Sequence, residues 1–234
     1  MRVLWITNTV FPDLSKALGN KAPVVGGWMY GLANDLSKSG VSLTVATSRS
    51  NINSFKGTIN GITYYLLKGE KPSTQYDRSL EAQWKSLISE VKPEVVHIQG
   101  SEYAQGLSLI TACPNLKYVV SIQGLISVYA RYYPGAIPLN QIKKHKTFRD
   151  FIKRDGIIQA KNKFNKRGEL IEKKYFRLVN NFIGRTRWDR DHTKTLNPDA
   201  DYHFCNESLR DAFYTARKWD IETKQDHTIF LSQA

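Results

Sequence analysis

The sequence has only two cysteines, Cys113 and Cys205, among its 234 residues. They match neither a metal-binding spacing nor a disulfide framework, which argues against a disulfide-stapled secreted domain and favours a reducing, cytoplasmic setting. The sequence also lacks any run of eighteen apolar residues, and no leader separates Met1 from the first apolar segment. We therefore expect neither a membrane span nor a signal peptide.

Acidic residues are scarce relative to basic ones. The chain carries 21 Asp and Glu against 34 Lys and Arg, a net charge of +13. Much of the excess lies between Lys143 and Arg177, where thirteen basic residues accompany four acidic ones. Such a stretch suits three settings: a solvated helix face, an anionic membrane surface or a nucleic acid. Charge alone leaves these alternatives open.

Apolar segments typical of buried strands alternate with helical patterns along the chain. The predicted strands are 3–7, 41–46, 61–67, 94–98, 117–122, 181–184 and 202–204. The predicted helices are 27–39, about 73 to 91, a short helix capped by Ser101, one opened by the capping-box pattern of Thr186 and Asp189, and 207–218. This alternation predicts an α/β fold, a Rossmann-like doubly wound parallel sheet of about seven strands with helices on both faces.

Two further segments are less regular. Residues 123 to about 140 are rich in tyrosine and proline and predict a loop, and the basic stretch after it predicts helices broken near Gly156 or Gly168. A last apolar segment, 227–231, predicts one more strand.

A pair of glycines, Gly26 and Gly27, stands between the first strand and the first helix. A helix that begins at such a turn presents unpaired amides and a partial positive charge, which stabilise a phosphate or a developing oxyanion. Paired glycines also serve simply as tight turns, which is the alternative interpretation.

Polar residues follow several of the predicted strands. Ligands of open parallel sheets bind beyond the carboxyl ends of the strands, so these residues are expected to converge on one cleft. The long loop from Asn8 to Val25 lies at the same edge, and long loops often bind ligands. The predicted cleft residues are Gln99, Glu102, Gly124, Arg185, Thr186 and Arg187. No metal-binding pattern accompanies them, and we expect no metal.

Three segments carry a resemblance to a known family: Gly26-Gly27, residues 92–98 (KPEVVHI) and residues 183–190 (IGRTRWDR). In their order and spacing they resemble the N-terminal half of a GT-B glycosyltransferase of the large retaining family 4, over nearly the whole chain. The resemblance implies an N-terminal acceptor-binding Rossmann-like domain over residues 1–220. Residues 221–234 would be a linker and the first strand of a C-terminal donor-binding domain.

The resemblance also implies roles for individual residues. Gly26 and Gly27 would approach the donor diphosphate and the reacting sugar. Family members often carry a histidine directly after the fifth strand, where this chain has Gln123, the candidate catalytic position. Glutamine can hydrogen-bond a sugar hydroxyl but cannot shuttle a proton.

The implied activity is sugar transfer from a nucleotide-sugar to a saccharide or lipid-linked acceptor with retention of configuration, as in cell-surface polysaccharide or lipopolysaccharide synthesis. This chain alone is expected to be inactive. The basic stretch from Lys143 to Arg177 would contact an anionic membrane at its inner face, and no nucleic-acid partner is expected.

Two other classes of protein remain as alternatives. A basic nucleic-acid-binding α/β domain would suit the isoelectric point of 9.7 and the interleaved Tyr and Phe. No helix-turn-helix, zinc or single-strand-binding signature accompanies that composition. A nicotinamide-dependent dehydrogenase is the second alternative. It is disfavoured because the chain lacks G-x-G-x-x-G and has Thr47-Ser48-Arg49 where an acidic ribose ligand would follow the second strand.

Overall fold

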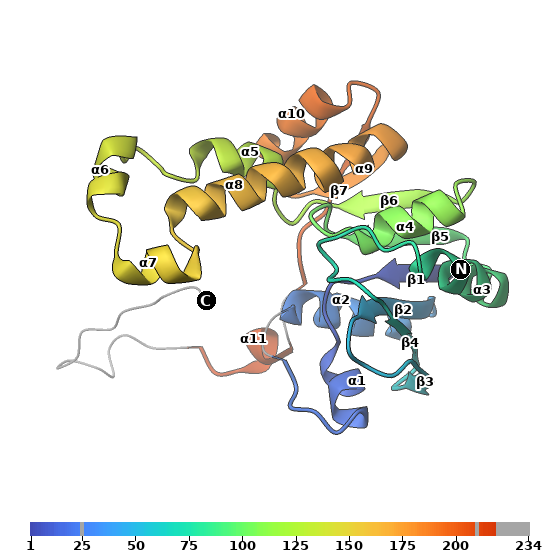
Figure 1. The fold of residues 1–234 in the computed structure, drawn as a ribbon. Helices are drawn as coiled ribbons and strands as arrows, with labels where there is room; N and C mark the ends of the chain where they lie inside the picture. The colour runs from blue at the N-terminus through green and yellow to red at the C-terminus, as the bar shows by residue number, and fades with distance from the viewer. Residues whose placement is uncertain (24–25, 209–210, 219–234) are drawn as a thin grey trace.

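The computed structural model of the chain describes residues 1–23, 26–208 and 211–218 (Figure 1). Within these ranges eight strands form one sheet in the order β3-β4-β2-β1-β5-β6-β7-β8. Neighbouring strands are parallel except for β3, which pairs antiparallel with β4. The predicted α/β class is confirmed, with eight strands where about seven were expected. The predicted strand 227–231 and the predicted second domain from residue 221 lie outside the described residues.

The strands are β1 (Arg2–Ile6), β2 (Ser42–Arg49), β3 (Phe55–Ile59), β4 (Ile62–Lys68), β5 (Val95–Gln99), β6 (Tyr118–Ser121), β7 (Asn181–Gly184) and β8 (Asp201–Phe204). The helices are α1 (Pro12–Ala17), α2 (Gly27–Lys38), α3 (Leu80–Val91), α4 (Gln105–Ala112), α5 (Ile126–Tyr132), α6 (Leu139–Lys144), α7 (Phe148–Lys153), α8 (Ile157–Arg167), α9 (Lys173–Leu178), α10 (Arg187–Leu196) and α11 (Asp211–Thr215), with a π-helix, η1 (Gly168–Glu172), between α8 and α9.

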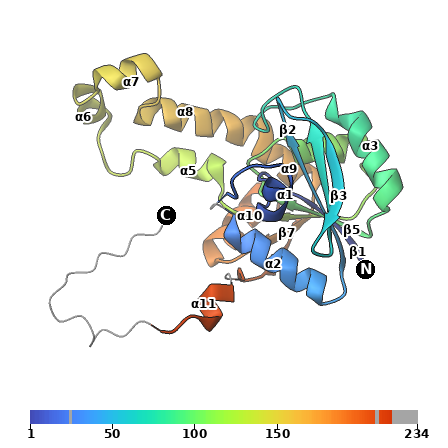
Figure 2. The same cartoon turned by 90° about the horizontal axis from the view of Figure 1, so that it is seen from below.

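The sheet has a separate hydrophobic core on each face. Helices α1 and α2 pack on one face over β1, β2 and β4, where Trp5 and Met29 are buried. Helices α3, α4 and α9 pack on the other face, where Trp84 and Phe176 are buried (Figure 2). This two-sided cover is the reason that most of the strands are apolar throughout, as in other parallel sheets.

The chain reverses its direction across the sheet between β1 and β5. After β1 it adds β2 and β4 on one side, and it then returns to pair β5 with the other side of β1. Gln105 of α4 spans this point, where its Nε2 donates to the carbonyl oxygen of Thr7 at 2.7 Å. Ligands of open α/β sheets bind at such a reversal, beyond the carboxyl ends of the strands.

Several predicted helix starts were wrong. Helix α3 begins at Leu80 and not near residue 73, because the carboxylate of Asp77 accepts hydrogen bonds from the amides of Glu70, Lys71 and Ser79 and fixes the preceding loop. Helix α4 begins at Gln105, so Ser101 does not cap it.

Two predicted loops contain helices, and one predicted helix is shorter than expected. The loop after β1 contains α1, and the loop predicted for residues 123–140 contains α5. Of the helix predicted over 207–218, the described residues contain only α11.

The start of the basic segment lies in an arm, which we define as α6 and α7 with the residues joining them, 139–153. Figures 1 and 2 show that the arm extends away from the sheet, at the far end of α5 and α8. No residue of α6 or α7 is buried. None of the helices in the described ranges is long and apolar enough to cross a bilayer.

Candidate functional site

The first turn of α2 presents backbone amides at the carboxyl edge of the sheet. Gly26 precedes the helix with a φ of 76°, a left-handed conformation that favours glycine. A Cβ at this position would also lie 3.0 Å from Thr9 Cγ2 and 3.1 Å from Met29 Cε. Among the described residues no side chain caps α2, and its first turn holds no acidic residue. These amides therefore keep the partly positive character that binds anions.

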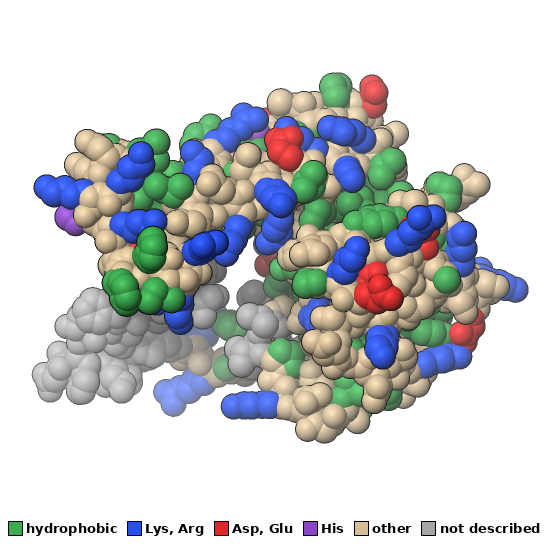
Figure 3. Space-filling view, in the orientation of Figure 1, with side chains coloured by type: hydrophobic (Ala, Val, Ile, Leu, Met, Phe, Trp, Pro, Cys, Tyr) green, Lys and Arg blue, Asp and Glu red, His purple; other side chains and the backbone are tan. Residues whose placement is uncertain are grey.

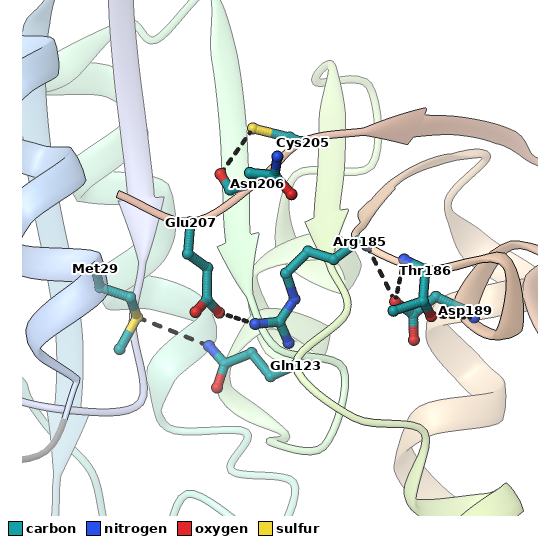
Figure 4. A network of polar contacts seen from close by, with 8 residues as sticks. All are labelled: Met29, Gln123, Arg185, Thr186, Asp189, Cys205, Asn206 and Glu207. Atoms are coloured by element: carbon teal, nitrogen blue, oxygen red, sulfur yellow. Dashed lines mark hydrogen bonds and ion pairs between the residues drawn. The ribbon is translucent and has the colours of Figure 1, made fainter. Parts of the chain in front are cut away.

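Gln123 lies against this turn, although it follows β6 in the sequence. Its Nε2 is 3.7 Å from Met29 Sδ (Figure 4). A thioether is a weak acceptor, so the amide of the half-buried Gln123 stays available for a stronger partner. The structure thus brings together two predicted features, the glycine turn that follows β1 and Gln123, which follows β6.

An ion pair lies beside Gln123 on the β7 side of the edge. Arg185 directly follows β7, and its guanidinium contacts the carboxylate of Glu207, which lies beyond β8. Figure 4 shows both side chains pointing toward each other next to Gln123. The side chains are 36% and 30% exposed, so solvent weakens the pair. A ligand phosphate can compete with Glu207 for the guanidinium, which binds carboxylates and phosphates through the same pair of N–H groups.

Thr186 is the N-cap of α10. Its Oγ1 accepts a hydrogen bond from the amide of Asp189 at 3.0 Å, and the Asp189 carboxylate accepts one in return from the amide of Thr186 at 3.0 Å. The predicted capping box is confirmed. The same carboxylate accepts from the amide of Arg185 at 3.0 Å, which fixes the backbone that carries the guanidinium. Arg187 is exposed in the first turn of the helix.

Gln99 lies in a buried polar layer under the edge, with an exposure of 2%. Its Nε2 is 3.3 Å from His97 Nδ1, and His97 Nε2 is 2.6 Å from Ser121 Oγ. Trp5 packs edge-on against the His97 ring, and His97 as a whole residue is half-buried. Burial lowers the pKa of His97 to about 4, so its ring is neutral at physiological pH. Gln99 therefore belongs to the buried layer under the edge and is not exposed to a ligand.

Gly124 borders a row of aromatic rings that the sequence did not predict. A Cβ at Gly124 would lie 2.8 Å from Tyr129 Cε2. Tyr129 stacks on Trp188 with ring centroids 5.3 Å apart, and Trp188 meets His192 edge-on at 4.5 Å. Since Tyr129 is 48% exposed, this row offers an aromatic surface next to Gly124.

Glu102 lies beyond β5 in an enclosed position. Arg167 Nη2 donates to the main-chain oxygen of Glu102 at 2.7 Å, and its guanidinium lies over the ring of Tyr103. Within the described part of the chain, Glu102 Oε2 has no hydrogen-bond partner. Burial, with a smaller contribution from the nearby Glu172, raises the pKa of Glu102 to about 7. The Glu102 carboxyl therefore titrates near neutral pH, where its protonated and ionised forms are both populated.

Glu172 connects the helical layer to the loop that carries Gln123. Its carboxylate accepts hydrogen bonds from the amides of Ile126 and Ser127, each at 2.8 Å, and from Ser101 Oγ at 3.3 Å. These two amides belong to the first turn of α5, which has no side-chain cap from its own N-cap residue. Glu172 is fully buried and takes the place of that cap.

The π-helix η1 brings Glu172 within hydrogen-bond distance of the first turn of α5. A Cβ at Gly168 would lie 2.6 Å from Ser127 Cα, so only glycine allows η1 to approach α5 this closely. Glu172 is the last residue of η1 and meets the same turn of α5. Single π-turns inside longer helices often occur near functional sites.

We expect the free energy of unfolding to fall as pH rises from 4.5 to about 7, because over this range Glu102 ionises in the unfolded chain but stays protonated in the folded chain. Its folded-state pKa of about 7 lies above the ordinary value of 4.5, so over this range the folded chain retains a proton that the unfolded chain releases. The loss is limited to about 3 kcal/mol. Glu102→Gln should flatten this part of the profile, as measured by urea unfolding below pH 4.5 and above pH 7.

Glu169→Gln is the matched control for the Glu102 experiment. It removes one carboxylate from the neighbouring π-helix, where Glu169 pairs with Lys173 and is 49% exposed. We expect its pH profile to parallel that of the unaltered chain. A Glu102→Gln profile as steep as that of the unaltered chain would contradict the assignment of a raised pKa.

A wide hollow on the surface lies elsewhere along the same edge. It has a volume of about 970 Å³ and is lined by residues that follow β2 and β4 and by the start of α3, among them Asn51, Lys68 and Gln83. None of the predicted site residues lines it. We assign the candidate site to the region where Gly26, Gln123 and Arg185 converge. This region combines the uncapped N-terminus of α2 with the basic side chain of Arg185, and the hollow does not.

The parallel sheet with helices on both faces and a polar carboxyl edge is that of a Rossmann-like α/β domain. Sucrose-phosphate synthase from Thermosynechococcus elongatus has a similar fold, with a TM-score of 0.50 at 10% sequence identity. The likeness covers 87% of this chain and 47% of that chain. At this identity it demonstrates the shared fold alone.

UGT73P12 from Glycyrrhiza uralensis, solved with glycyrrhetinic acid 3-O-monoglucuronide, matches with a TM-score of 0.43 at 9% identity. That match covers 88% of this chain and 48% of the other, and its TM-score is too low to demonstrate a shared fold. The chain spans about half the length of both solved structures. No protein-family model and no curated protein matches the sequence.

Proposed function

We propose that this chain is the acceptor-binding half of a retaining sugar-nucleotide glycosyltransferase related to family 4. The whole protein would transfer a sugar from a nucleotide-sugar to a saccharide or lipid-linked acceptor, as in the synthesis of cell-surface polysaccharides. The observation that carries the proposal is the uncapped first turn of α2, which faces Gln123 and lies near the guanidinium of Arg185.

Each of these groups suits one part of the transfer reaction. In that reaction an acceptor hydroxyl attacks the anomeric carbon of the sugar. The nucleotide diphosphate departs with the electrons of the broken bond, and its phosphate oxygen takes up the hydroxyl proton. The amides at Gly26 and Gly27 are suited to stabilise the negative charge that develops on the leaving phosphate. Once released from Glu207, the guanidinium of Arg185 can stabilise the same charge. Gln123 suits a hydrogen bond to a sugar hydroxyl.

Catalysis by this half would rest on position and electrostatics. Gln123 cannot act as a proton-transferring base, and His97 lies in the buried polar layer with a pKa of about 4. Holding the hydroxyl and the anomeric carbon in reach of each other supplies much of the rate increase in such reactions. The donor-binding groups would belong to the second domain.

We place the reaction at the cytoplasmic face of a membrane. The basic residues from Lys143 to Arg177 suit an anionic surface, and lipid-linked acceptors lie in that surface. The structure places the start of this stretch in the exposed arm. Helix α8, which follows, has no buried residue, whereas residues of η1 and α9 pack in the core beside the sheet.

The test is sugar transfer by the full-length protein, followed by the release of nucleotide diphosphate from a panel of nucleotide-sugars. Gln123→Ala should lower kcat/KM about tenfold, the effect of one lost hydrogen bond to the substrate. Two results together would overturn the proposal: no transfer or hydrolysis of any nucleotide-sugar, and micromolar, salt-sensitive binding of an oligonucleotide.

A further inference from the structure

The arm carries an exposed apolar face on α7. Phe148, Phe151 and Ile152 are 79%, 69% and 63% exposed. They stand at positions i, i+3 and i+4, and therefore lie on one side of the helix. Figure 3 shows apolar side chains gathered at the end of the arm. Exposed apolar clusters of this kind mark surfaces that contact a partner or a membrane.

The same arm is rich in cations. Its basic residues are Lys143, Lys144, Lys146, Arg149 and Lys153, and Arg154 directly follows it. Only two acidic residues, Asp150 and Asp155, lie within or next to it. Asp150 is engaged in the cap of α7, and Asp155 pairs with Arg149 at 3.0 Å. Lys146 lies over the ring of Phe151, so charge and apolar surface are adjacent.

Helix α7 is preformed by its own cap. Thr147 Oγ1 accepts from the amide of Asp150 at 3.2 Å, and the Asp150 carboxylate accepts from the amide of Thr147 at 2.9 Å. This capping box fixes the direction of a helix with only six residues. The cap stabilises the first turn of α7, which keeps the three apolar side chains on one side of the helix.

We propose that α7 inserts Phe148, Phe151 and Ile152 into the interface of an anionic lipid bilayer, with the surrounding Lys and Arg on the headgroups. Apolar side chains beside a basic rim are the chemistry of interfacial helices. The inference deepens the membrane contact of the proposed function, and it assigns that contact to the arm and not to the whole basic stretch. Its test does not require sugar transfer.

Two other occupants fit these observations less well. A nucleic acid would use the cations but leave three large apolar side chains of α7 without a role. A second copy of the chain placed arm to arm would bring like charges together. An anionic bilayer satisfies both the apolar face and the positive charge.

The experiment measures binding of the chain to phosphatidylcholine vesicles with about 30% phosphatidylglycerol by co-sedimentation. Phe148→Ser/Phe151→Ser should weaken binding at least about tenfold, because the inserted apolar area is lost. The matched control is Leu170→Ser/Leu178→Ser, which removes two leucines that are 53% and 54% exposed outside the arm. We expect the control to bind within about twofold of the unaltered chain.

Charge is tested in the same assay. Lys146→Gln/Lys153→Gln should weaken binding about tenfold at low salt, and Lys16→Gln/Lys38→Gln, on α1 and α2, should leave it nearly unchanged. Vesicles of phosphatidylcholine alone should bind weakly. Tryptophan at position 151, introduced as Phe151→Trp, should shift its emission to the blue on binding and be quenched by brominated lipids.

Three results would overturn the proposal. The first is equal vesicle binding by Phe148→Ser/Phe151→Ser, with circular dichroism confirming that it is folded. The second is an oligonucleotide complex that depends on Lys146 and Lys153 in a chain that does not bind vesicles. The third is a dimer in sedimentation velocity that this serine variant abolishes. Transfer to a water-soluble acceptor by the full-length variant reports on the proposed function separately.

Discussion

Aspartate in place of Gly27 should reduce sugar transfer by the full-length protein at least about a hundredfold and leave the chain as stable as before. A carboxylate in the first turn of α2 interacts favourably with the helix dipole, by about 0.5 kcal/mol. The same carboxylate would occupy the amides that suit the donor diphosphate and would repel its charge. Activity should therefore fall sharply while stability does not, which a general folding defect cannot produce.

The measurement is kcat/KM for the nucleotide-sugar, together with the thermal midpoint of the same preparation. Gly27→Asn is the matched control, because it has nearly the same shape without the charge. We expect this variant to lose no more than about tenfold in activity. Equal losses for the two variants would assign the effect to the size of the side chain, and full activity of Gly27→Asp would remove the turn from the mechanism.

Seven of the eight strands could be predicted from the sequence. Strands such as β1, β4 and β6 are buried between helical layers and are therefore short apolar runs. Strand β3, from Phe55 to Ile59, is the exception. Its residues alternate between half-buried and exposed, and Gly57 lies at its centre. Edge strands have weak apolar patterns of this kind, and only pairing with β4 reveals this one.

Helix starts could be predicted where the cap is local and not where it is distant. Thr186 and Asp189 are three residues apart, so their capping box is visible in the sequence. The amides of Ile126 and Ser127 are instead satisfied by Glu172, 46 and 45 residues away. No sequence pattern links these positions, and α5 was therefore predicted as a loop.

The same distinction applies to the candidate site. The carboxyl ends of parallel strands must share one edge, so Gly26, Gln123 and Arg185 could be assigned to the same region from topology alone. The contact of Gln123 with Met29 and the pairing of Arg185 with Glu207 depend on side-chain packing. Neither has a periodic or local signal in the sequence.

Alanine in place of Glu172 should lower the free energy of unfolding by about 4 kcal/mol. The substitution leaves the amides of Ile126 and Ser127 buried without an acceptor, and it opens a cavity between η1 and α5. Burial raises the pKa of Glu172, so ionising this carboxyl in the fold already has a cost that its hydrogen bonds partly offset. Glu172→Gln keeps one acceptor oxygen and should lose about half as much.

Urea unfolding measures the global effect, and hydrogen exchange measures the local one. The amides of Ile126 and Ser127 should exchange faster in Glu172→Ala, because the contact that fixes the first turn of α5 is gone. Glu169→Ala removes an exposed carboxylate from the same π-helix and should change stability by less than about 0.5 kcal/mol. If Glu172→Ala matched that control in both measurements, the start of α5 would not depend on this carboxylate. Gln123, three residues before α5, would then owe its position to other contacts.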